Sequence, residues 1–140
     1  GGGGRCGKLR AVYFHSDDKA FPGTIEFVED TCQEHDFELT TYKCGYKEGI
    51  KDLVENRGAK AFLIGTRSGD PNGKESEFFC PSSKGWPPFM RVNPVINWDY
   101  GTVWRFLKKY DIPYFHLYDQ GYTSLGDRHC THKNPLLRKP

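Results

Sequence analysis

The sequence lacks any paired arrangement of cysteines. Its five cysteines are an odd number, and no two of them form a CxxC pair. They stand far apart in the chain, at Cys6, Cys32, Cys44, Cys80 and Cys130. A wide, odd set of this kind argues against a disulfide framework and favours a reducing compartment. We therefore expect a cytoplasmic protein, with an organellar form as the alternative.

Long apolar runs and an excess of one charge are also missing. No hydrophobic stretch approaches the length of a membrane-spanning helix, and no signal-peptide pattern opens the chain. Lysine and arginine number 20 against 18 acidic residues, so the formal net charge is only +2. Nothing in this balance requires nucleic acid or an anionic membrane as partner. We expect a monomer that binds small molecules and neither nucleic acid nor membrane.

Several well-known catalytic and metal-binding patterns are absent as well. The glycine-rich start GGGGRCGK lacks the spacing of a Walker A loop, and no GxSxG elbow surrounds Ser124 or any other serine. The segment His129-Cys130-Thr131-His132 could suggest zinc, but one such cluster offers too few well-spaced ligands. The sequence therefore predicts no protein-held metal centre.

The apolar pattern of the first half predicts alternating strands and helices. Strands are expected at 9–15, 37–43 and 59–66, the last apolar enough to be buried on both faces. Apolar residues at helical spacing predict amphipathic helices at 24–35 and 46–56. This β-α-β-α-β order indicates an α/β fold, in which helices flank a parallel sheet.

The second half is less regular. Gly58 is a plausible stop for the second helix, and residues 71–88 are rich in Pro, Gly and Ser, which predicts a long loop. An extended segment is expected at 91–98, and Asp99 is expected to cap a third helix over 100–111. The composition, with 36% hydrophobic and 15% aromatic residues, predicts a small core and aromatics left over for a binding site.

The stretch GTRSGDP follows the third predicted strand and is a candidate ligand site. Ligands of parallel sheets bind outside the carboxyl ends of the strands, and the acidic turn HSDD after the first strand shares that position. Arg67 could clamp a phosphate, and Asp70 could hold Mg²⁺ or accept a hydrogen bond from a ring N–H. Gly65 would let a ligand approach the backbone. The alternative is a solvated surface turn.

Two later segments are further candidates. Trp86 in KGWPPFMR could stack on a flat heterocycle beside Arg91, or it could simply pack over the sheet. The segment GYTSLGDR could offer backbone N–H groups and Arg128 to a phosphate.

Taken in order, VYFHSDDKAFP, LIGTRSGDP, GWPPFMRVNPVINWDYGTVWRFL and GYTSLGDRHCTHKNPLLRK resemble the eukaryotic-type FAD synthases, or FMN adenylyltransferases. That family is a branch of the PAPS reductase-like proteins with an adenine nucleotide α-hydrolase-like, Rossmann-like fold. The resemblance implies transfer of AMP from MgATP to FMN, which gives FAD and pyrophosphate. It covers 9–139.

The resemblance also implies which positions form the site. The strand end with Phe14, His15 and Asp17 matches the adenosine pocket of the family, and Trp86 with Arg91 matches the WPxFxR motif associated with the flavin. Arg67, Asp70 and Arg128 are expected to serve catalysis. The remaining implied binding positions are Gly65 in GTRSGDP and, in the loop near the phosphates, Gly121, Ser124, Leu125 and Gly126.

The chain departs from the family pattern at both ends. The family begins with a strand and an SFNGGKD phosphate loop and continues into a basic tail, and neither aligns here. We therefore interpret residues 1–8 as a flexible leader and residues 9–140 as a partial synthase domain with weak or absent activity. The alternatives are a PAPS or APS reductase-like enzyme and a non-catalytic flavin- or nucleotide-binding module.

Overall fold

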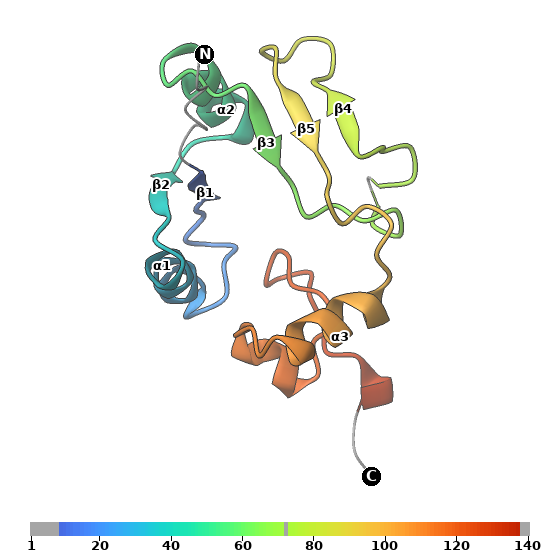
Figure 1. Cartoon of the computed structure of the whole chain (residues 1–140). Helices are drawn as coiled ribbons and strands as arrows, with labels where there is room; N and C mark the ends of the chain where they lie inside the picture. Colours follow the sequence, from blue (N-terminus) through green and yellow to red (C-terminus); the bar gives the residue numbers. More distant parts are fainter. Residues whose placement is uncertain (1–8, 72, 138–140) are drawn as a thin grey trace. The chain divides into compact units, whose positions relative to one another are not determined.

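The computed structural model describes residues 9–71 and 73–137, and these fall into two compact units (Figure 1). The first unit comprises Gly1–Gly45 and Phe115–Pro140, and the second comprises Tyr46–Tyr114. Each unit is described by itself. The predicted leader at 1–8 lies outside the described residues.

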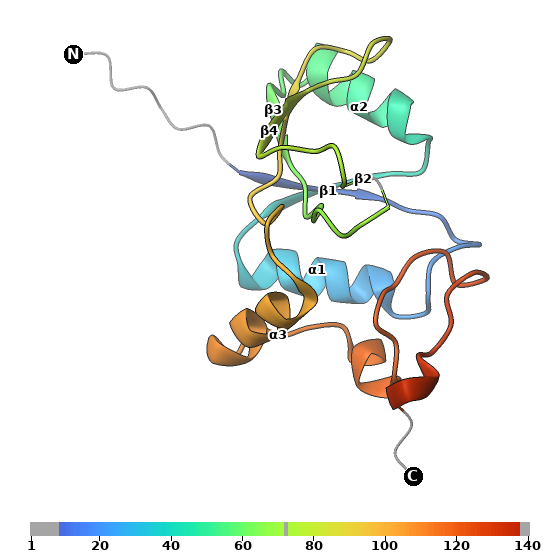
Figure 2. The ribbon, with the colours of Figure 1, turned by 90° about the vertical axis from the view of Figure 1, so that its right-hand side faces the viewer.

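The first unit is built on two parallel strands and one helix. Strands β1 (Arg10–Phe14) and β2 (Glu38–Tyr42) pair in parallel, with Arg10 opposite Glu38 and Phe14 opposite Tyr42. Helix α1 (Thr24–Glu34) connects them and lies alongside the pair (Figure 2). Two parallel strands need a crossover connection, which is usually a helix. The helical apolar periodicity of residues 24–35 agrees with this role. The predictions of these three elements are confirmed.

The core of the first unit lies between α1 and the returning C-terminal segment. The Phe27 and Phe115 rings are 5.4 Å apart, and Cys32, Phe115 and Leu117 are buried. The 3₁₀ helices η1 (His116–Gln120) and η2 (Pro135–Leu137) belong to this segment. Residues far apart in the sequence thus form one small core. Its small size agrees with the prediction from the composition.

The second unit begins with helix α2 (Tyr46–Glu55), whose Leu53 is buried. Gly58 follows with φ of 70°, and the Ala59 N–H donates to the Leu53 carbonyl at 2.9 Å. A left-handed glycine ends a helix in this way because it carries no Cβ. The predicted helix stop at Gly58 is confirmed.

A small mixed sheet follows in the second unit. Strand β5 (Met90–Val92) pairs in parallel with β3 (Ala61–Leu63) and antiparallel with β4 (Phe79–Pro81). The α/β fold with parallel strands is confirmed. The prediction of a long loop at 71–88 is wrong at β4, because these three residues pair with β5, the next strand along the chain.

The extended segment predicted at 91–98 is also too long. It ends at Val92, and two turns follow, in which Ile96 N–H donates to Asn93 and Trp98 N–H donates to Val95. The Asn93 side chain starts this change of direction: its Nδ2 donates to the Glu77 carbonyl at 2.8 Å. Asn93 is only 3% exposed.

One face of the β3–β5–β4 sheet is apolar and exposed. The pairing register and the alternation of side chains put six apolar residues on it: Ala61, Leu63, Phe79, Pro81, Met90 and Val92. Leu63 is 59% exposed and Phe79 is 65% exposed. The prediction that 59–66 is buried on both faces is therefore wrong. An apolar strand can be buried on both faces, but it is buried only where another part of the protein packs against each face.

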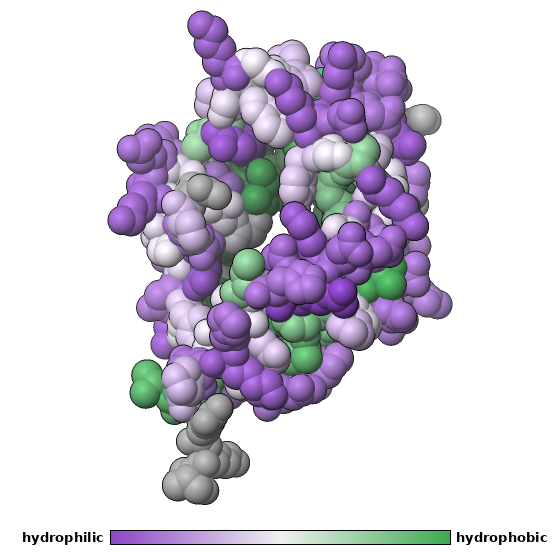
Figure 3. Space-filling view, turned by 180° about the vertical axis from the view of Figure 1, so that it is seen from behind, coloured by the Kyte–Doolittle hydropathy of each residue, from purple (hydrophilic) through white to green (hydrophobic). Residues whose placement is uncertain are grey.

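Helix α3 (Tyr100–Lys109) ends the second unit and begins where the sequence predicts. The Asp99 carboxylate accepts a hydrogen bond from the Thr102 N–H at 2.6 Å. The Thr102 side chain first, and then this backbone bond, lower the pKa of Asp99. The Trp104 ring meets Tyr114 edge to face, with centroids 4.8 Å apart. Hydrophilic residues cover much of the surface seen in Figure 3. In the described part of the chain, no helix is long and apolar enough to cross a membrane.

Candidate functional site

The turn after β3 is closed by an arginine and an aspartate of the same motif. Asp70 Oδ2 accepts the Arg67 backbone N–H at 2.8 Å, and Oδ1 lies 3.3 Å from the Arg67 guanidinium. The side chains are 27% and 35% exposed, so water reaches both. Arg67 and Asp70 are therefore brought together, and each neutralises part of the charge that the other would offer to a ligand.

Gly73, which is not among the predicted site residues, closes the same turn. The Gly73 N–H donates to the Asp70 carbonyl at 2.9 Å, and Gly73 is buried. A Cβ at this position would lie 1.8 Å from the Arg67 carbonyl oxygen. The turn can thus exist only with glycine here, and the sequence signal was the Asp-Pro-Asn-Gly pattern that is typical of tight turns.

Gly65 lies just before this turn, at the end of the third strand. No atom of the described residues lies within 4 Å of the position of a Cβ on Gly65. The Ser68 N–H donates to the Ile96 carbonyl at 2.8 Å, which joins the turn to the segment after β5. The predicted close approach of a ligand to Gly65 is compatible with this open backbone.

The flavin motif predicted around Trp86 lies on the β4–β5 connection. Trp86 is 36% exposed in a turn that its N–H closes on the Ser83 carbonyl, and Gly85 adopts a φ of 85° there. Arg91 Nη2 donates to the Pro81 carbonyl at 3.3 Å, while the buried Nε finds no partner among the described residues. Trp86 is therefore open to solvent, whereas Arg91 is held within the sheet.

In the first unit, the strand end after β1 holds a histidine–aspartate pair. His15 Nε2 lies 2.5 Å from Asp17 Oδ1. This hydrogen bond, followed by the charges of His15 and Lys43, holds the pKa of Asp17 below its ordinary value of 3.8. The buried His15 Nδ1 has no partner among the described residues. Phe14 stacks on Tyr42 at 5.5 Å, so its ring supports the strand pair.

The GYTSLG segment begins at a left-handed glycine and runs into a tight turn. Gly121 ends η1 with φ of 94°, and its carbonyl accepts the Asn134 N–H at 2.8 Å. Ser124 is exposed and Leu125 half-buried. The Gly126 N–H donates to Thr131 Oγ1 at 3.2 Å, which fixes the end of the segment.

Asp127 organises the turn that follows. Its carboxylate accepts the His129 N–H at 2.9 Å, and its carbonyl accepts the Cys130 N–H at 3.0 Å and the Thr131 hydroxyl at 2.8 Å. Aspartate is common at the first position of such turns because its carboxylate reaches the backbone two residues on. Residues 127–131 are called the DRHCT turn below.

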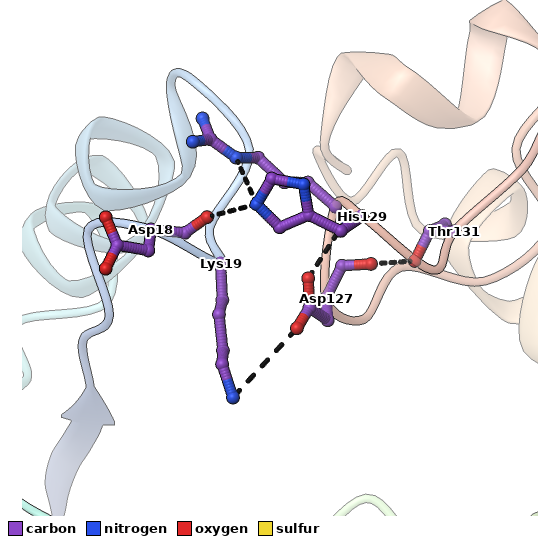
Figure 4. A network of polar contacts seen from close by, with 6 residues as sticks. Asp18, Lys19, Asp127, His129 and Thr131 are labelled. Atoms are coloured by element: carbon purple, nitrogen blue, oxygen red, sulfur yellow. Dashed lines mark hydrogen bonds and ion pairs between the residues drawn. The ribbon is translucent and has the colours of Figure 1, made fainter.

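The DRHCT turn contacts the loop after β1, residues 16–20 (Figure 4). The Arg128 N–H donates to the Lys19 carbonyl at 2.9 Å, and His129 Nε2 lies 2.9 Å from the Asp18 carbonyl oxygen. The predicted positions at Asp17 and Arg128 thus stand on two loops that touch. Sequence reasoning missed His129 in this contact, because a partner 111 residues away leaves no local signal.

The candidate residues therefore form two groups. The first unit holds the strand-end and GYTSLG positions: Phe14, His15, Asp17, Gly121, Ser124, Leu125, Gly126 and Arg128. The second unit holds the two remaining motifs: Gly65, Arg67, Asp70, Trp86 and Arg91. In the described ranges, no three His, Cys, Asp or Glu side chains gather as a metal site, and the cysteines of those ranges carry free thiols.

Residues 46–133 match the phosphoadenosine phosphosulfate reductase domain, and the chain belongs to that family. A solved phosphoadenylyl-sulfate reductase of Candida auris shares the fold, with a TM-score of 0.66 over 90% of this chain and 20% identity. At that identity the likeness shows the fold alone.

The likeness to FAD synthases goes further, as the motifs predicted. A probable FAD synthase of Schizosaccharomyces pombe is 37% identical over 121 residues, which is 86% of this chain and 46% of the relative. The crystal structure of Candida glabrata FMN adenylyltransferase with FMN and an ATP analog superposes with a TM-score of 0.87 at 32% identity. That match covers 95% of this chain and 48% of the solved one. The chain thus spans about half the length of these two proteins.

Proposed function

We propose that this chain is part of an FAD synthase that transfers an adenylyl group from MgATP to FMN. A phosphate oxygen of FMN attacks the α-phosphorus of ATP, and the bond from that phosphorus to the bridging oxygen breaks. Pyrophosphate leaves with the electron pair, and FAD is the product. Such a displacement needs two anions held in line and neutralised, and it needs no protein nucleophile.

The observation that carries the proposal is the match to a solved FMN adenylyltransferase. It extends over 95% of the chain at 32% identity, and the structure named there contains FMN and an ATP analog. A second structure of the Candida glabrata enzyme contains FAD and inorganic pyrophosphate, the two products of the proposed reaction.

Each group of candidate residues has a separate task in this proposal. In the first unit, the loop after β1 and the GYTSLG segment bind the nucleotide, and Arg128 offers positive charge to its phosphates. In the second unit, Trp86 offers a ring face to the isoalloxazine. Arg67 contributes charge to the FMN phosphate, with Asp70 holding its backbone and guanidinium in place. Mg²⁺ enters with ATP, whose phosphate oxygens bind it.

The first experiment tests the reaction. The chain is incubated with FMN and MgATP, and FAD is separated and quantified by chromatography, with pyrophosphate release measured in parallel. We expect both products in equal amounts and at a low rate, in keeping with the weak activity predicted for a partial domain. The rate should fall at least about tenfold further in Arg128→Ala because a charged contact to a phosphate is lost. Production of neither compound would overturn the proposal of a synthase reaction for this chain.

The second experiment tests flavin binding without turnover. Quenching of FMN fluorescence gives a Kd for the unaltered chain and for Trp86→Ala. Loss of an aromatic stacking partner should weaken FMN about tenfold. Phe79→Ala is the matched control, since Phe79 is a 65% exposed aromatic of the same unit with no assigned role. Equal FMN affinity in all three proteins would contradict the role of Trp86, and FMN binding without any FAD formation would favour a flavin-binding module.

A further inference from the structure

The DRHCT turn and the loop 16–20 are joined by three contacts, of which Figure 4 shows the second and the third. One is the backbone bond from the Arg128 N–H to the Lys19 carbonyl, at 2.9 Å. The second is the His129 ring on the Asp18 carbonyl, also at 2.9 Å. The third is a 4.0 Å ion pair between Lys19 and Asp127, whose side chains are 66% and 33% exposed. Exposed pairs at that distance contribute little, so the first two contacts carry the junction.

The chemistry of the partner settles which way the His129 hydrogen bond runs. A carbonyl oxygen only accepts, so Nε2 must carry the hydrogen and donate it to Asp18. Nε2 then has no lone pair for Arg128 Nε, and their 3.5 Å contact is not a hydrogen bond. The His129 backbone is held as well, because its N–H donates to Asp127 Oδ1 at 2.9 Å. His129 is thus fixed at both ends between two segments of the chain.

We propose that His129 is a positioning residue that holds the loop 16–20, and with it Asp17, in the arrangement that receives the nucleotide. This proposal rests on the proposed synthase function. His129 binds the residue next to Asp17, and Asp17 in turn is paired with His15 at the strand end. The ring itself need not touch the nucleotide. It acts through the Asp18 backbone, since a peptide anchored at its carbonyl oxygen limits where the neighbouring side chain can lie.

The turn does not need the His129 ring in order to form. Asp127 and Thr131 close it through the Cys130 N–H, the Thr131 hydroxyl and the Gly126 N–H. Removal of the ring should therefore release the loop 16–20 and leave the DRHCT turn intact. A residue that only maintained the local fold would disturb both together.

Amide hydrogen exchange, followed residue by residue by NMR, tests the anchoring. In His129→Ala we expect the Arg128 amide, which bonds to Lys19, to exchange about fivefold faster, while Cys130 keeps its rate. In His129→Gln the side-chain amide can still donate, and we expect the Arg128 rate to return most of the way. His132→Ala is the matched control, an exposed histidine of the same segment. Unchanged Arg128 exchange in His129→Ala, or equal acceleration at Cys130, would overturn the anchoring.

Calorimetric titration tests the consequence for the ligand. The Kd for MgATP should rise about fivefold in His129→Ala and stay near the unaltered value in His129→Gln and His132→Ala, while the Kd for FMN stays constant in all of them. Equal MgATP affinity in His129→Ala and the unaltered chain would overturn the positioning role. If the unaltered chain bound no MgATP, the proposed function and the positioning role would both fail, whereas the exchange rates would still decide whether His129 anchors the loop.

Discussion

The Arg67–Gly73 turn of the second unit and the DRHCT turn of the first are held by opposite means. In both, an aspartate carboxylate accepts a backbone N–H, at 2.8 Å for Asp70 and 2.9 Å for Asp127. The first turn then depends on a missing side chain, because Gly73 leaves no room for a Cβ beside the Arg67 carbonyl. The second depends on side chains that are present, above all those of Asp127 and Thr131.

This difference determines how each turn responds to mutation. Adding atoms should break the Arg67–Gly73 turn, and removing atoms should loosen the DRHCT turn. Backbone contacts are tolerant of substitution only where the added Cβ finds space. The same size of mutation, one methyl group or one side chain, should therefore destabilise the first turn when it is added and the second turn when it is removed.

The largest effect is expected from Gly73→Ala. A Cβ placed 1.8 Å from the Arg67 carbonyl oxygen forces the turn open, so the free energy of unfolding should fall by about 1–3 kcal/mol. Urea denaturation measures this value. Gly69→Ala is the matched control, because no described atom lies within 4 Å of its Cβ position. Equal stability of the two variants would show that the Arg67–Gly73 turn is not limited by space.

A smaller effect is expected from Asp70→Ala, which removes the acceptor of the Arg67 N–H and of its guanidinium. Both side chains are partly exposed, so we expect a loss of about 1 kcal/mol in the free energy of unfolding. Asp70→Asn keeps an acceptor for the backbone N–H and should recover at least half of that loss. If Asn recovered nothing, the charge of Asp70 rather than its backbone hydrogen bond would hold the turn.

Lys19→Met should change stability by less than about 0.5 kcal/mol, because the pair with Asp127 is long and exposed. The Lys19 carbonyl still accepts the Arg128 N–H in this variant. Exchange of the Arg128 amide should therefore stay close to the unaltered rate, in contrast to His129→Ala. A fivefold acceleration in Lys19→Met would mean that the ion pair, and not the His129 ring, joins the loops.

The smallest effect is expected from Asp17→Asn, and its pH dependence should identify it: the difference in stability from the unaltered chain should be present at neutral pH and vanish in acid. The folded-state pKa of Asp17 is lowered from 3.8, mainly by the His15 hydrogen bond, so the stabilisation exists above the ordinary value and is lost as the pH falls through the lowered one. The unaltered chain should lose stability below about pH 4 more steeply than Asp17→Asn. Thermal unfolding between pH 2 and pH 6 measures both slopes, and parallel slopes would contradict the pairing.

The sequence predicted well what local pattern determines. Helical periodicity located α1 and α2, Asp99 marked the start of α3, and Gly58 marked the end of α2. Turn-forming residues after β3 predicted a turn there, but not that Asp70 would accept the Arg67 backbone N–H. Each of these features depends on residues at most a few positions apart, so single-sequence reasoning can find them.

The features that escaped prediction depend on contacts that form only in the folded chain. β4 forms only because β5 pairs with it, and the open face of β3 follows from the same register. The contact of His129 with Asp18 joins residues 111 positions apart. Gly73 lies closer to its partner, but the conflict with the Arg67 carbonyl arises only once the turn has folded. Neither secondary-structure propensity nor the spacing of residues predicts such contacts.

The exposed sheet face of the second unit makes the chain surface-active. Leu63, Phe79 and Met90, which are 59%, 65% and 37% exposed, present a nonpolar patch to water on one side of a largely hydrophilic protein. We expect dilute samples to adsorb to plastic and to the air–water interface through this patch, and a solvatochromic dye to detect it. Titrations of FMN or MgATP at low protein concentration therefore call for a mild non-ionic detergent, which occupies the patch and keeps the chain in solution.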